Sequence, residues 1–490
     1  MAERGVVAAG HPLTAQAGAD ILRAGGNAVD AALAALMTSF MAEPLLTGLG
    51  SGGYMLVAPP GGAPVLLDFM VEAPGRGASP SSRAPLDAVV IDFGDAVQVF
   101  HIGASSCGVY GMPAGIASAA ERFGTVPLAD LAAPAIALAR DGLEVNETQG
   151  YLWELLGPIA TSTPESCDRY CVDGRVPRAG EVVRDPDLAD GIARLAADGA
   201  GPFYGGDIGT AVSDWVTSRG GTLTQLDLAA YGTVPREPVR VGYHGRDVLT
   251  NPPPSAGGIL IAYALALLQR GSGPPGAAAI VDAMEAAQAE RTVAFLDGLA
   301  EPGFEESFMA SRLGSTTHVS VLDANGWACA VTTTNGEGSG LVVPGTGIHV
   351  NNMMGEQDLS PAGWFTHPPG RRLPSMMAPT IVLDDGSPEL VLGSAGSNRI
   401  RSAIVQVIVN AIDHGMDAQA AVDAPRLHFE DGLVYAEPGI DADTLKGRQV
   451  AWFRDRNLFF GGCQAVERHH ETREFSGGGD PRRGGAVVRA

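Results

Sequence analysis

Residues 316–334 read TTHVSVLDANGWACAVTTT, a run in which residue types alternate as they do along a β-strand and its return strand. Residues 316–322 predict one strand and residues 327–334 the other, because Val and Thr at alternating positions favour the pleated conformation. Between them, Asp323-Ala324-Asn325-Gly326 has the composition of a turn. The run therefore predicts a β-hairpin.

The hairpin places hydrogen-bonding groups beside Thr316. A loop of two or three residues pairs position 316 with Thr333, Thr334 or Asn335, and a hydroxyl or amide in that place can orient a nucleophile. Threonine is a weak nucleophile without a base. A cut between Ser315 and Thr316 would supply one, because the new α-amino group has a pKa of about 7.7–8.0. The alternative interpretation of the run is an ordinary half-buried strand.

Further short motifs accompany the hairpin along nearly the whole chain. They are GNAVDAA (26–32), GSGGYML (50–56), NPPPSAGG (251–258), NNM (351–353), APTI (378–381), GSAG (393–396), DAPR (423–426) and GDPR (479–482). In this order, and with Thr316-Thr317-His318-x-Ser320, they resemble the γ-glutamyltranspeptidases, which are N-terminal-nucleophile hydrolases.

The resemblance implies a self-cleaving enzyme. The cut between Ser315 and Thr316 would give a large subunit of residues 1–315 and a small subunit of residues 316–490, which stay associated as one co-folded unit. Thr316 would be the nucleophile of both self-cleavage and catalysis, and Thr334 its hydrogen-bonded partner. The implied chemistry is acyl transfer through an acyl-enzyme that water or an amine then releases.

The resemblance also implies an oxyanion hole and a fold. Gly396 and Ser397 match paired glycines whose backbone N–H groups stabilise the oxyanion. Serine replaces the second glycine, but the backbone donor survives this change. The implied fold is an α+β four-layer αββα sandwich. Residue patterns alone support only a mixed α/β or α+β class.

The substrate-binding positions depart from the family pattern. Met70 stands where the family has an arginine for the substrate carboxylate. Met353 and Glu356 replace the pair that holds the substrate amine. Ser375 matches the first of two adjacent serines, and Met376 replaces the second. The predicted substrate-binding set is Met70, Asn335, Met353, Glu356, Ser375 and Met376.

These replacements make the expected pocket more apolar. A methionine cannot offer the charged, bidentate donors that a carboxylate prefers, so the loss of the arginine costs a γ-glutamyl group roughly 1.5–3 kcal/mol or more. We therefore expect glutathione to be a poor substrate. Nearby arginines either supply a replacement contact or form surface and inter-subunit ion pairs, the interpretation that we favour. They are Arg371, Arg372, Arg399 and Arg401.

Two alternatives to amide cleavage remain open. Some relatives of this family serve natural-product pathways, and one branch breaks a carbon–carbon bond while making alkylproline precursors of antibiotics. The same threonine can attack a ketone-like carbonyl. The second alternative, a non-catalytic member that only binds a ligand, is disfavoured because Thr316, Thr334 and Gly396 are retained.

Composition excludes some classes of partner. The net charge of −23 argues against nucleic acid and anionic membranes, and 45% hydrophobic residues in 490 is ordinary for a globular protein. The start of the chain has neither a basic nor an apolar leader region, so we expect a cytoplasmic protein. Small-molecule substrates are the expected partners, and no cofactor or metal is expected. His469-His470 lacks ligand partners at metal-binding spacing.

Cysteines and two glycine-rich segments complete the predictions. Five cysteines form no regular framework, so Cys167 and Cys171 are expected as free thiols; a loop disulfide and a metal site are the alternatives. GLGSGG (48–53) fits a dinucleotide fingerprint by spacing only, since a helix precedes it and a strand follows. Residues 336–340 form a loop that is expected to border the pocket, where Glu337 can offer a polar contact.

Several other elements are expected from local patterns. Helices are predicted over 14–23, 28–41 and 399–414, with Gly25-Gly26 ending the first helix and Asn27 capping the second. Further strands are predicted over 54–58, 64–69 and 380–383.

Overall fold

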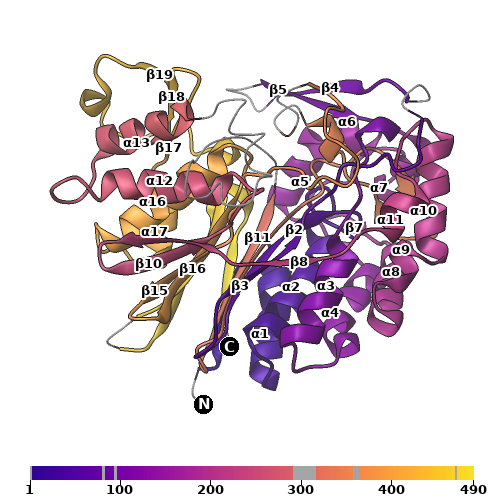
Figure 1. The fold of residues 1–490 in the computed structure, drawn as a ribbon, viewed down its shortest axis with the longest axis horizontal. Helices are drawn as coiled ribbons and strands as arrows, with labels where there is room; N and C mark the ends of the chain where they lie inside the picture. The colour runs from indigo at the N-terminus through magenta and orange to yellow at the C-terminus, as the bar shows by residue number, and fades with distance from the viewer. Residues whose placement is uncertain are drawn as a thin grey trace.

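The computed structural model describes residues 3–79, 83–92, 97–290, 316–356, 359, 363–469 and 472–490. Two β-sheets lie face to face in the middle of the molecule, and helices cover the outer face of each sheet (Figure 1). This arrangement is the predicted four-layer αββα sandwich of the α+β class.

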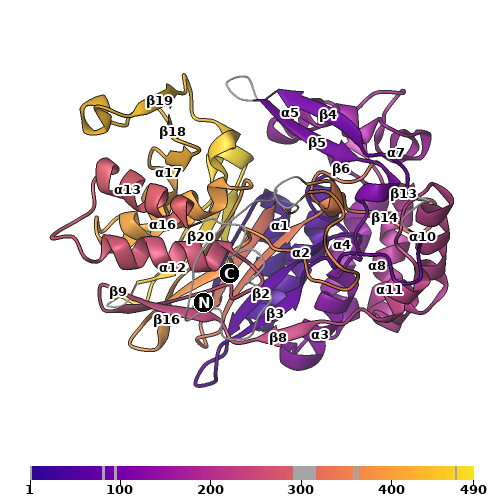
Figure 2. The same ribbon diagram turned by 45° about the horizontal axis from the view of Figure 1, so that its top comes forward.

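The first sheet has seven antiparallel strands and contains the predicted hairpin at its centre. In spatial order they are β22 (Ala486–Arg489), β1 (Gly5–Ala9), β11 (Thr317–Asp323), β12 (Ala328–Thr334), β2 (Gly52–Ala58), β3 (Val65–Phe69) and β8 (Val234–Arg236). The two ends of the chain meet in this sheet, because β1 pairs with β22, and Figure 2 shows the termini close together.

The second sheet has six antiparallel strands and faces the first. In spatial order they are β21 (Phe475–Gly478), β20 (Gly462–Arg468), β16 (Ser387–Ala395), β15 (Thr380–Asp384), β10 (Arg246–Thr250) and β9 (Val239–Tyr243). Strands β16 and β20 contact β11, so the middle of the second sheet lies over the hairpin.

Helices flank both sheets. Those on the side of the first sheet are α1 (Pro12–Ala24), α2 (Ala28–Ala42), α3 (Met112–Phe123), α4 (Leu128–Asp141), α5 (Glu147–Leu155), α6 (Gly157–Ala160), α7 (Pro164–Tyr170), α8 (Pro186–Asp198), α9 (Gly201–Tyr204), α10 (Asp207–Ser218) and α11 (Gln225–Ala229). Those on the side of the second sheet are α12 (Gly257–Leu268), α13 (Ala277–Ala289), α16 (Arg399–Ile412) and α17 (Ala418–Asp423).

Short strands and 3₁₀ turns decorate this frame. The strands are β4 (Asp87–Asp92), β5 (Val97–Ile102), β6 (Leu143–Glu144), β7 (Val182–Val183), β13 (Val342–Val343), β14 (Ile348–His349), β17 (Leu427–Glu430), β18 (Leu433–Ala436) and β19 (Gln449–Trp452). The turns are η2 (Ala104–Ser106), η3 (Met353–Gly355), η5 (Ala442–Leu445), η6 (Leu458–Phe460) and η7 (Pro481–Arg483).

The local predictions agree with the observed elements to within two residues at each end. Gly25 ends α1 with a left-handed backbone (φ 99°), a conformation that glycine adopts without strain. Asn27 caps α2, and Asp30 completes a capping box with it. Helix α16 begins at Arg399 as predicted and ends at Ile412. Residues 48–53 follow α2 and run into the start of β2, the context that excludes a dinucleotide fingerprint.

The prediction of free thiols at Cys167 and Cys171 is wrong. The two cysteines form a disulfide, with their Cα atoms 4.9 Å apart. Cys167 lies in α7 and Cys171 is its C-cap residue, so their four-residue spacing brings the side chains to the same side of the helix. Cys107, Cys329 and Cys463 are buried free thiols.

None of the helices in the described part of the chain is both long and apolar enough to cross a bilayer.

Candidate active site

Thr316 lies immediately before β11 and is fully buried. Along β11, Val319 and Val321 pack toward the helices outside the first sheet, whereas Leu322 joins the core between the sheets. Since successive side chains of a strand point to opposite faces, this alternation directs the side chain of Thr316 toward the second sheet. Ser315, the other half of the predicted cleavage site, lies outside the described residues.

His318 is on the same face of β11 and links the two sheets. Its Nδ1 lies 2.7 Å from Thr332 Oγ1 and its Nε2 lies 2.8 Å from Ser320 Oγ, which donates to the backbone oxygen of Gln464 in β20. A side chain at Gly393 of β16 would begin 2.2 Å from the imidazole, so glycine makes this approach possible. Burial lowers the pKa of His318 to about 3, which keeps the ring neutral.

The register of the hairpin selects Thr334 as the neighbour of Thr316. Thr317 pairs with Thr333, so the next position sets Thr316 opposite Thr334. Thr334 Oγ1 accepts a hydrogen bond from the N–H of Gly336 at 2.8 Å, which leaves the hydroxyl its own proton to donate. Thr333 faces the other way, with its Oγ1 2.9 Å from Thr47 Oγ1.

Asn335 holds the chain that follows β12. Its Oδ1 accepts from Ser51 Oγ at 3.1 Å, and its backbone oxygen accepts from the N–H groups of Gly338 and Asn352. Through Asn335, the loop over 336–340 is therefore anchored to Ser51, just before β2, and to the Asn351-Asn352 segment.

Gly396 and Ser397 connect β16 to α16, and both have positive φ, 112° and 62°. Their carbonyl oxygens accept from the N–H groups of Arg399 and Ile400, which form the first turn of the helix. Their own N–H groups thus lie at the positive end of the helix dipole, a place that favours an oxyanion. Ser397 Oγ is buried without a hydrogen-bond partner among the described residues.

Met70 follows β3 and is completely buried in the core between the sheets. Its N–H donates to Asp68 Oδ1 at 2.9 Å, and its carbonyl oxygen accepts from Tyr231 Oη at 2.8 Å. A side chain at Gly52 would begin 3.1 Å from the carbonyl carbon of Met70, and Gly52 pairs with Thr334. The methionine is therefore close to the hairpin end that carries Thr316.

Arg372 lies beside Met70 but is occupied by other groups. It donates to the carbonyl oxygen of Met70, lies 4.4 Å from the centre of the Tyr231 ring, and is 3.5 Å from Glu72 Oε1. Arg372 and Glu72 therefore form a structural ion pair. Glu72 precedes position 316 in the sequence and Arg372 follows it, so this is the kind of ion pair that the sequence favours.

The other arginines considered as replacements have different surroundings. Arg399 Nε donates to the carbonyl oxygen of Phe459 at 2.7 Å, and Arg401 Nη2 donates to that of Phe429 at 3.3 Å. Arg371 is half-buried.

The remaining predicted binding residues lie on two segments near the same core. Met353 opens the 3₁₀ turn η3 and is fully buried, and Glu356 is 7% exposed. A side chain at Gly336 would begin 2.6 Å from Glu356 Oε1, which brings this carboxylate to the 336–340 loop.

Ser375 and Met376 lie on the second of these segments. Ser375 Oγ accepts from the N–H of Met377 at 3.0 Å, and Met376 is fully buried. Met70, Met353 and Met376 belong to one hydrophobic cluster.

Sequence reasoning missed Glu43 and Arg483. Glu43 accepts a hydrogen bond from Thr317 Oγ1 at 2.9 Å, although 274 positions separate the two residues. Burial and the charge of Arg399 lower the pKa of Arg483 to about 10, while Asp480, Glu43 and Glu337 oppose the shift. Neither residue belongs to a local pattern. The only advance signal for Glu43 is its place at the end of an apolar helix, since a carboxylate is rarely buried there without a partner.

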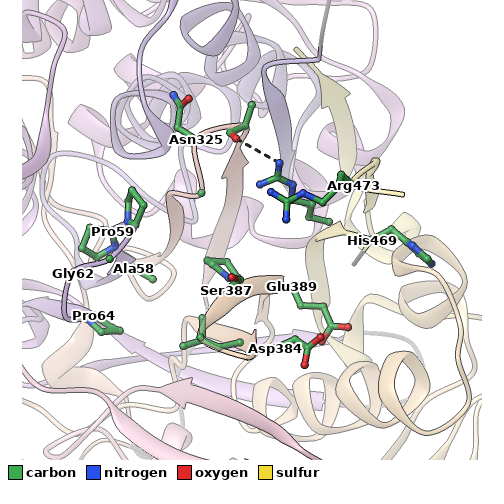
Figure 3. A pocket seen from close by; sticks show the side chains of 18 of the residues that line it. Ala58, Pro59, Gly62, Pro64, Asn325, Asp384, Ser387, Glu389, His469 and Arg473 are labelled. Atoms are coloured by element: carbon green, nitrogen blue, oxygen red, sulfur yellow. Dashed lines mark hydrogen bonds between the residues drawn. The ribbon is translucent and has the colours of Figure 1, made fainter. Parts of the chain in front are cut away.

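A cavity of about 400 Å³, shown in Figure 3, lies at the turn end of the hairpin. Thr316 is not among the residues that line it. Asn325, Asp384, Glu389, His469 and Arg473 line it. Asn325 belongs to the turn at the opposite end of β11, and a seven-residue strand spans about 20 Å. His469 is exposed there, whereas its neighbour His470 lies outside the described residues.

Known proteins resemble the chain over most of its length. The sequence matches the family profile described as gamma-glutamyltranspeptidase over residues 14–307 and 299–490. It is 34% identical over 472 residues to the acylase ACY 1 proenzyme of Pseudomonas sp. (strain SE83), covering 89% of this chain and 84% of that protein. It is 31% identical over 507 residues to the glutathione hydrolase proenzyme of Escherichia coli (strain K12), covering 92% and 86%.

The fold is matched as well. The crystal structure of cephalosporin acylase from Bacillus halodurans has a TM-score of 0.84 and 27% identity, covering 99% of this chain and 96% of that one. The names of these relatives divide between acylases and a glutathione hydrolase, and two of them are proenzymes.

Proposed function

The chain belongs to the γ-glutamyltranspeptidase family of N-terminal-nucleophile hydrolases, and we propose that it cleaves itself before Thr316 and then acts as a threonine hydrolase or acyltransferase. The proposed products of self-cleavage are a large subunit, residues 1–315, and a small subunit, residues 316–490. Strands β1 and β11 come from the two subunits and pair side by side, which supports their staying associated.

Self-cleavage is proposed to proceed through an ester. Thr316 Oγ attacks the carbonyl carbon of Ser315, the C–N bond between the two residues breaks, and the nitrogen becomes the α-amino group of Thr316. Water then hydrolyses the ester, which returns the hydroxyl to Thr316 and leaves a carboxyl on Ser315. The freed amine has a pKa near neutrality and can serve as the base for each later attack on substrate.

The single observation that carries this proposal is the register of the hairpin. It sets Thr316 opposite the hydroxyl of Thr334, on the face of the first sheet that the second sheet covers. Gly396 and Ser397 directly follow a strand of that second sheet and offer backbone N–H groups at a helix N-terminus. A nucleophile, an orienting hydroxyl and oxyanion donors are the parts that acyl transfer requires.

The proposed substrate is a small molecule with an amide bond and an acyl group that is less polar than glutamate. Buried Met70, Met353 and Met376 support this choice, because they contribute apolar surface where the family pattern has polar or charged groups. Arg372 does not compensate, since its guanidinium is engaged by Glu72 and backbone oxygens. Flexible methionine side chains can adapt to an acyl chain of irregular shape.

Carbon–carbon bond hydrolysis is the second candidate for the same nucleophile. The methionine-rich surroundings favour it over glutathione hydrolysis, because a ketone-like substrate brings no α-amino acid group to be held. The acyl-enzyme and the later attack by water would be the same in both reactions.

The test uses a preparation that mass spectrometry shows to be two chains. Glutathione, anilides of aliphatic carboxylic acids and a β-diketone are offered to it, with Thr316→Ala as the control. We expect Thr316-dependent release from an aliphatic anilide at a kcat/KM at least about tenfold above that for glutathione, the equivalent of 1.4 kcal/mol. Preference for glutathione would contradict the proposal of a less polar substrate. Preference for the β-diketone would favour carbon–carbon bond hydrolysis as the reaction.

A further inference from the structure

Glu43 stands at the C-terminal end of α2, directly behind the nucleophile strand. Its Oε1 accepts the hydrogen bond from Thr317 Oγ1, and its Oε2 is buried without a hydrogen-bond partner among the described residues. A side chain at Gly10 would begin 2.3 Å from Oε1, so the glycine allows β1 to close over the carboxylate.

The segment that Glu43 begins contacts both strands of the hairpin at the end where Thr316 lies. Thr47 Oγ1 is 2.9 Å from Thr333 Oγ1 in β12, and the carbonyl oxygen of Leu46 accepts from the N–H of Asn335. The backbone oxygen of Glu43 in turn accepts from the N–H groups of Leu46 and Thr47. One short segment therefore sets the position of β11 and β12 together.

Glu43 acts from the opposite face of the sheet to the nucleophile. Thr317 and Thr316 are consecutive, and strand alternation directs their side chains to opposite faces. The carboxylate therefore contacts the neighbour of Thr316 and not its hydroxyl. Glu43 is placed to orient the backbone on the C-terminal side of the scissile bond.

The charge of Arg483 acts on this carboxylate, and its side chain lies near the turn that Gly396 and Ser397 form. Its charge is the one that opposes the raised pKa of Glu43, and its guanidinium would lie 3.6 Å from a side chain at Gly396. Burial is the larger influence and raises the pKa of Glu43 to about 7, with the Thr317 hydroxyl and Arg483 opposing it.

We propose that Glu43 is a positioning residue for self-cleavage, which holds Thr317 so that Thr316 and the bond before it keep the geometry of attack. The inference rests on the proposed function, because it assigns a role within the self-cleavage step. The ionised carboxylate accepts the Thr317 hydrogen bond more strongly than the protonated acid does. Self-cleavage should therefore accelerate as Glu43 loses its proton.

Among the residues that the structure describes, few titratable groups lie around Glu43, so its titration can be separated from theirs. From the β1–α1 junction comes His11, whose pKa burial lowers to about 4, and from α5 comes the neutral Gln149, which donates to the carbonyl oxygen of Ala42. Arg483 faces it from η7 and stays charged near neutral pH. Between pH 6 and 8, Glu43 is the group among these that changes charge.

The experiment follows self-cleavage of freshly synthesised full-length chain between pH 6 and 8, by denaturing gel and intact mass. For the wild type we expect the rate to rise through about pH 7. Glu43→Gln should slow cleavage at pH 8 at least about tenfold and abolish the rise. Asp20→Asn, an exposed carboxylate of α1, should behave as the wild type.

A second pair of variants tests the contact from its other side. Thr317→Val removes the donor and should slow cleavage as Glu43→Gln does, whereas Thr317→Ser keeps the hydroxyl and should restore the wild-type rate and pH profile. This pair decides the question alone if Glu43→Gln fails to fold. A Glu43→Gln or Thr317→Val chain with the wild-type rate and profile overturns the role of Glu43. A wild-type chain that stays uncut instead overturns the proposed function.

Discussion

The end of the hairpin around Thr316 and the core around Met70 depend on different kinds of chemical group. At the hairpin end, the candidate nucleophile is positioned and assisted largely by backbone features: the strand register, the N–H groups of Gly396 and Ser397, and glycines that allow close approach. Around Met70, the family pattern depends on the polar ends of side chains, and methionines occupy those places. Backbone features tolerate a change such as glycine to serine, whereas a single side-chain replacement alters which substrate is held.

The largest expected effect belongs to the nucleophile itself. Thr316→Ala should lower turnover of any accepted substrate by about 10³-fold or more, because it removes the hydroxyl that the proposed α-amino base activates to form the acyl-enzyme. The measurement is initial rate on the best anilide, with the mutant small and large subunits also supplied as two separate chains. Turnover that survives in Thr316→Ala would remove the hairpin end from the chemistry.

Acid should weaken the fold through histidines that are buried in the neutral form. Burial lowers the pKa of His318 and His349 to about 3 and that of His11 and His428 to about 4. The unfolded chain binds these protons below about pH 6.5 and the folded chain does not, so stability is full above pH 6.5 and is lost as pH falls toward 4.

Four such groups give a slope of up to about 5 kcal/mol per pH unit, and His318→Gln should reduce it by about a quarter. Urea unfolding at pH 7, 6 and 5 measures both slopes. Equal midpoints at the three pH values would show that these rings are not buried as neutral groups. An unchanged slope in His318→Gln would show that His318, which joins the sheets beside Thr316, does not contribute to the loss of stability in acid.

The region around Met70 can be challenged by returning the family's arginine. Met70→Arg buries a second guanidinium beside Arg372 and should cost about 3 kcal/mol or more of stability, without a large gain on glutathione. Met70→Leu is the matched control and should cost less than about 1.5 kcal/mol. Thermal unfolding and glutathione kinetics measure the two effects. A stable Met70→Arg enzyme with glutathione turnover raised tenfold would mean that this one residue explains the altered pocket.

A smaller effect is expected from the two neighbouring threonines of β12. Thr334→Ala should slow self-cleavage about 10- to 100-fold, since it removes the hydroxyl that is proposed to hydrogen-bond the nucleophile. Thr333→Ala removes a hydroxyl of the other face and should change the rate less than threefold. Time courses of the two variants, made side by side, compare the faces directly. Equal rates would mean that the register does not place Thr334 at the nucleophile.

Ser397→Gly should have the smallest effect. The backbone donor remains, so turnover should stay within about threefold of the wild type. Relief of the left-handed backbone at φ 62° is worth about 1 kcal/mol and is partly offset by the greater freedom of glycine when unfolded. Thermal unfolding should therefore change by only a few degrees. A large loss of turnover would assign a role to the buried serine hydroxyl.

The sequence predicted those parts of the molecule that local chemistry determines. The hairpin over 316–334 was predictable because its alternation and its turn agree, and α2 was predictable because Asn27 and Asp30 form its cap within one turn. The register remained open among three choices, since the turn can close in more than one way. The observed pairing of Thr317 with Thr333 resolves it.

The rest depended on contacts between distant parts of the chain. Glu43 meets Thr317 because α2 packs behind β11, and nothing near Glu43 in the sequence indicates this partner. Arg372 was ambiguous for the same reason, because Glu72 and Tyr231 come from other segments. The disulfide between Cys167 and Cys171 was not predicted, because an odd number of cysteines indicated no regular framework. The two cysteines are nevertheless spaced by about one helical turn.

The most direct test of the central claim is the intact mass of the purified wild-type chain beside that of Thr316→Ala. The account predicts two chains for the wild type, residues 1–315 and 316–490, with masses that sum to the 50.3 kDa of the whole plus one water, and a single chain for the variant. A single wild-type chain, a cut at another bond, or the same cut in Thr316→Ala would contradict it.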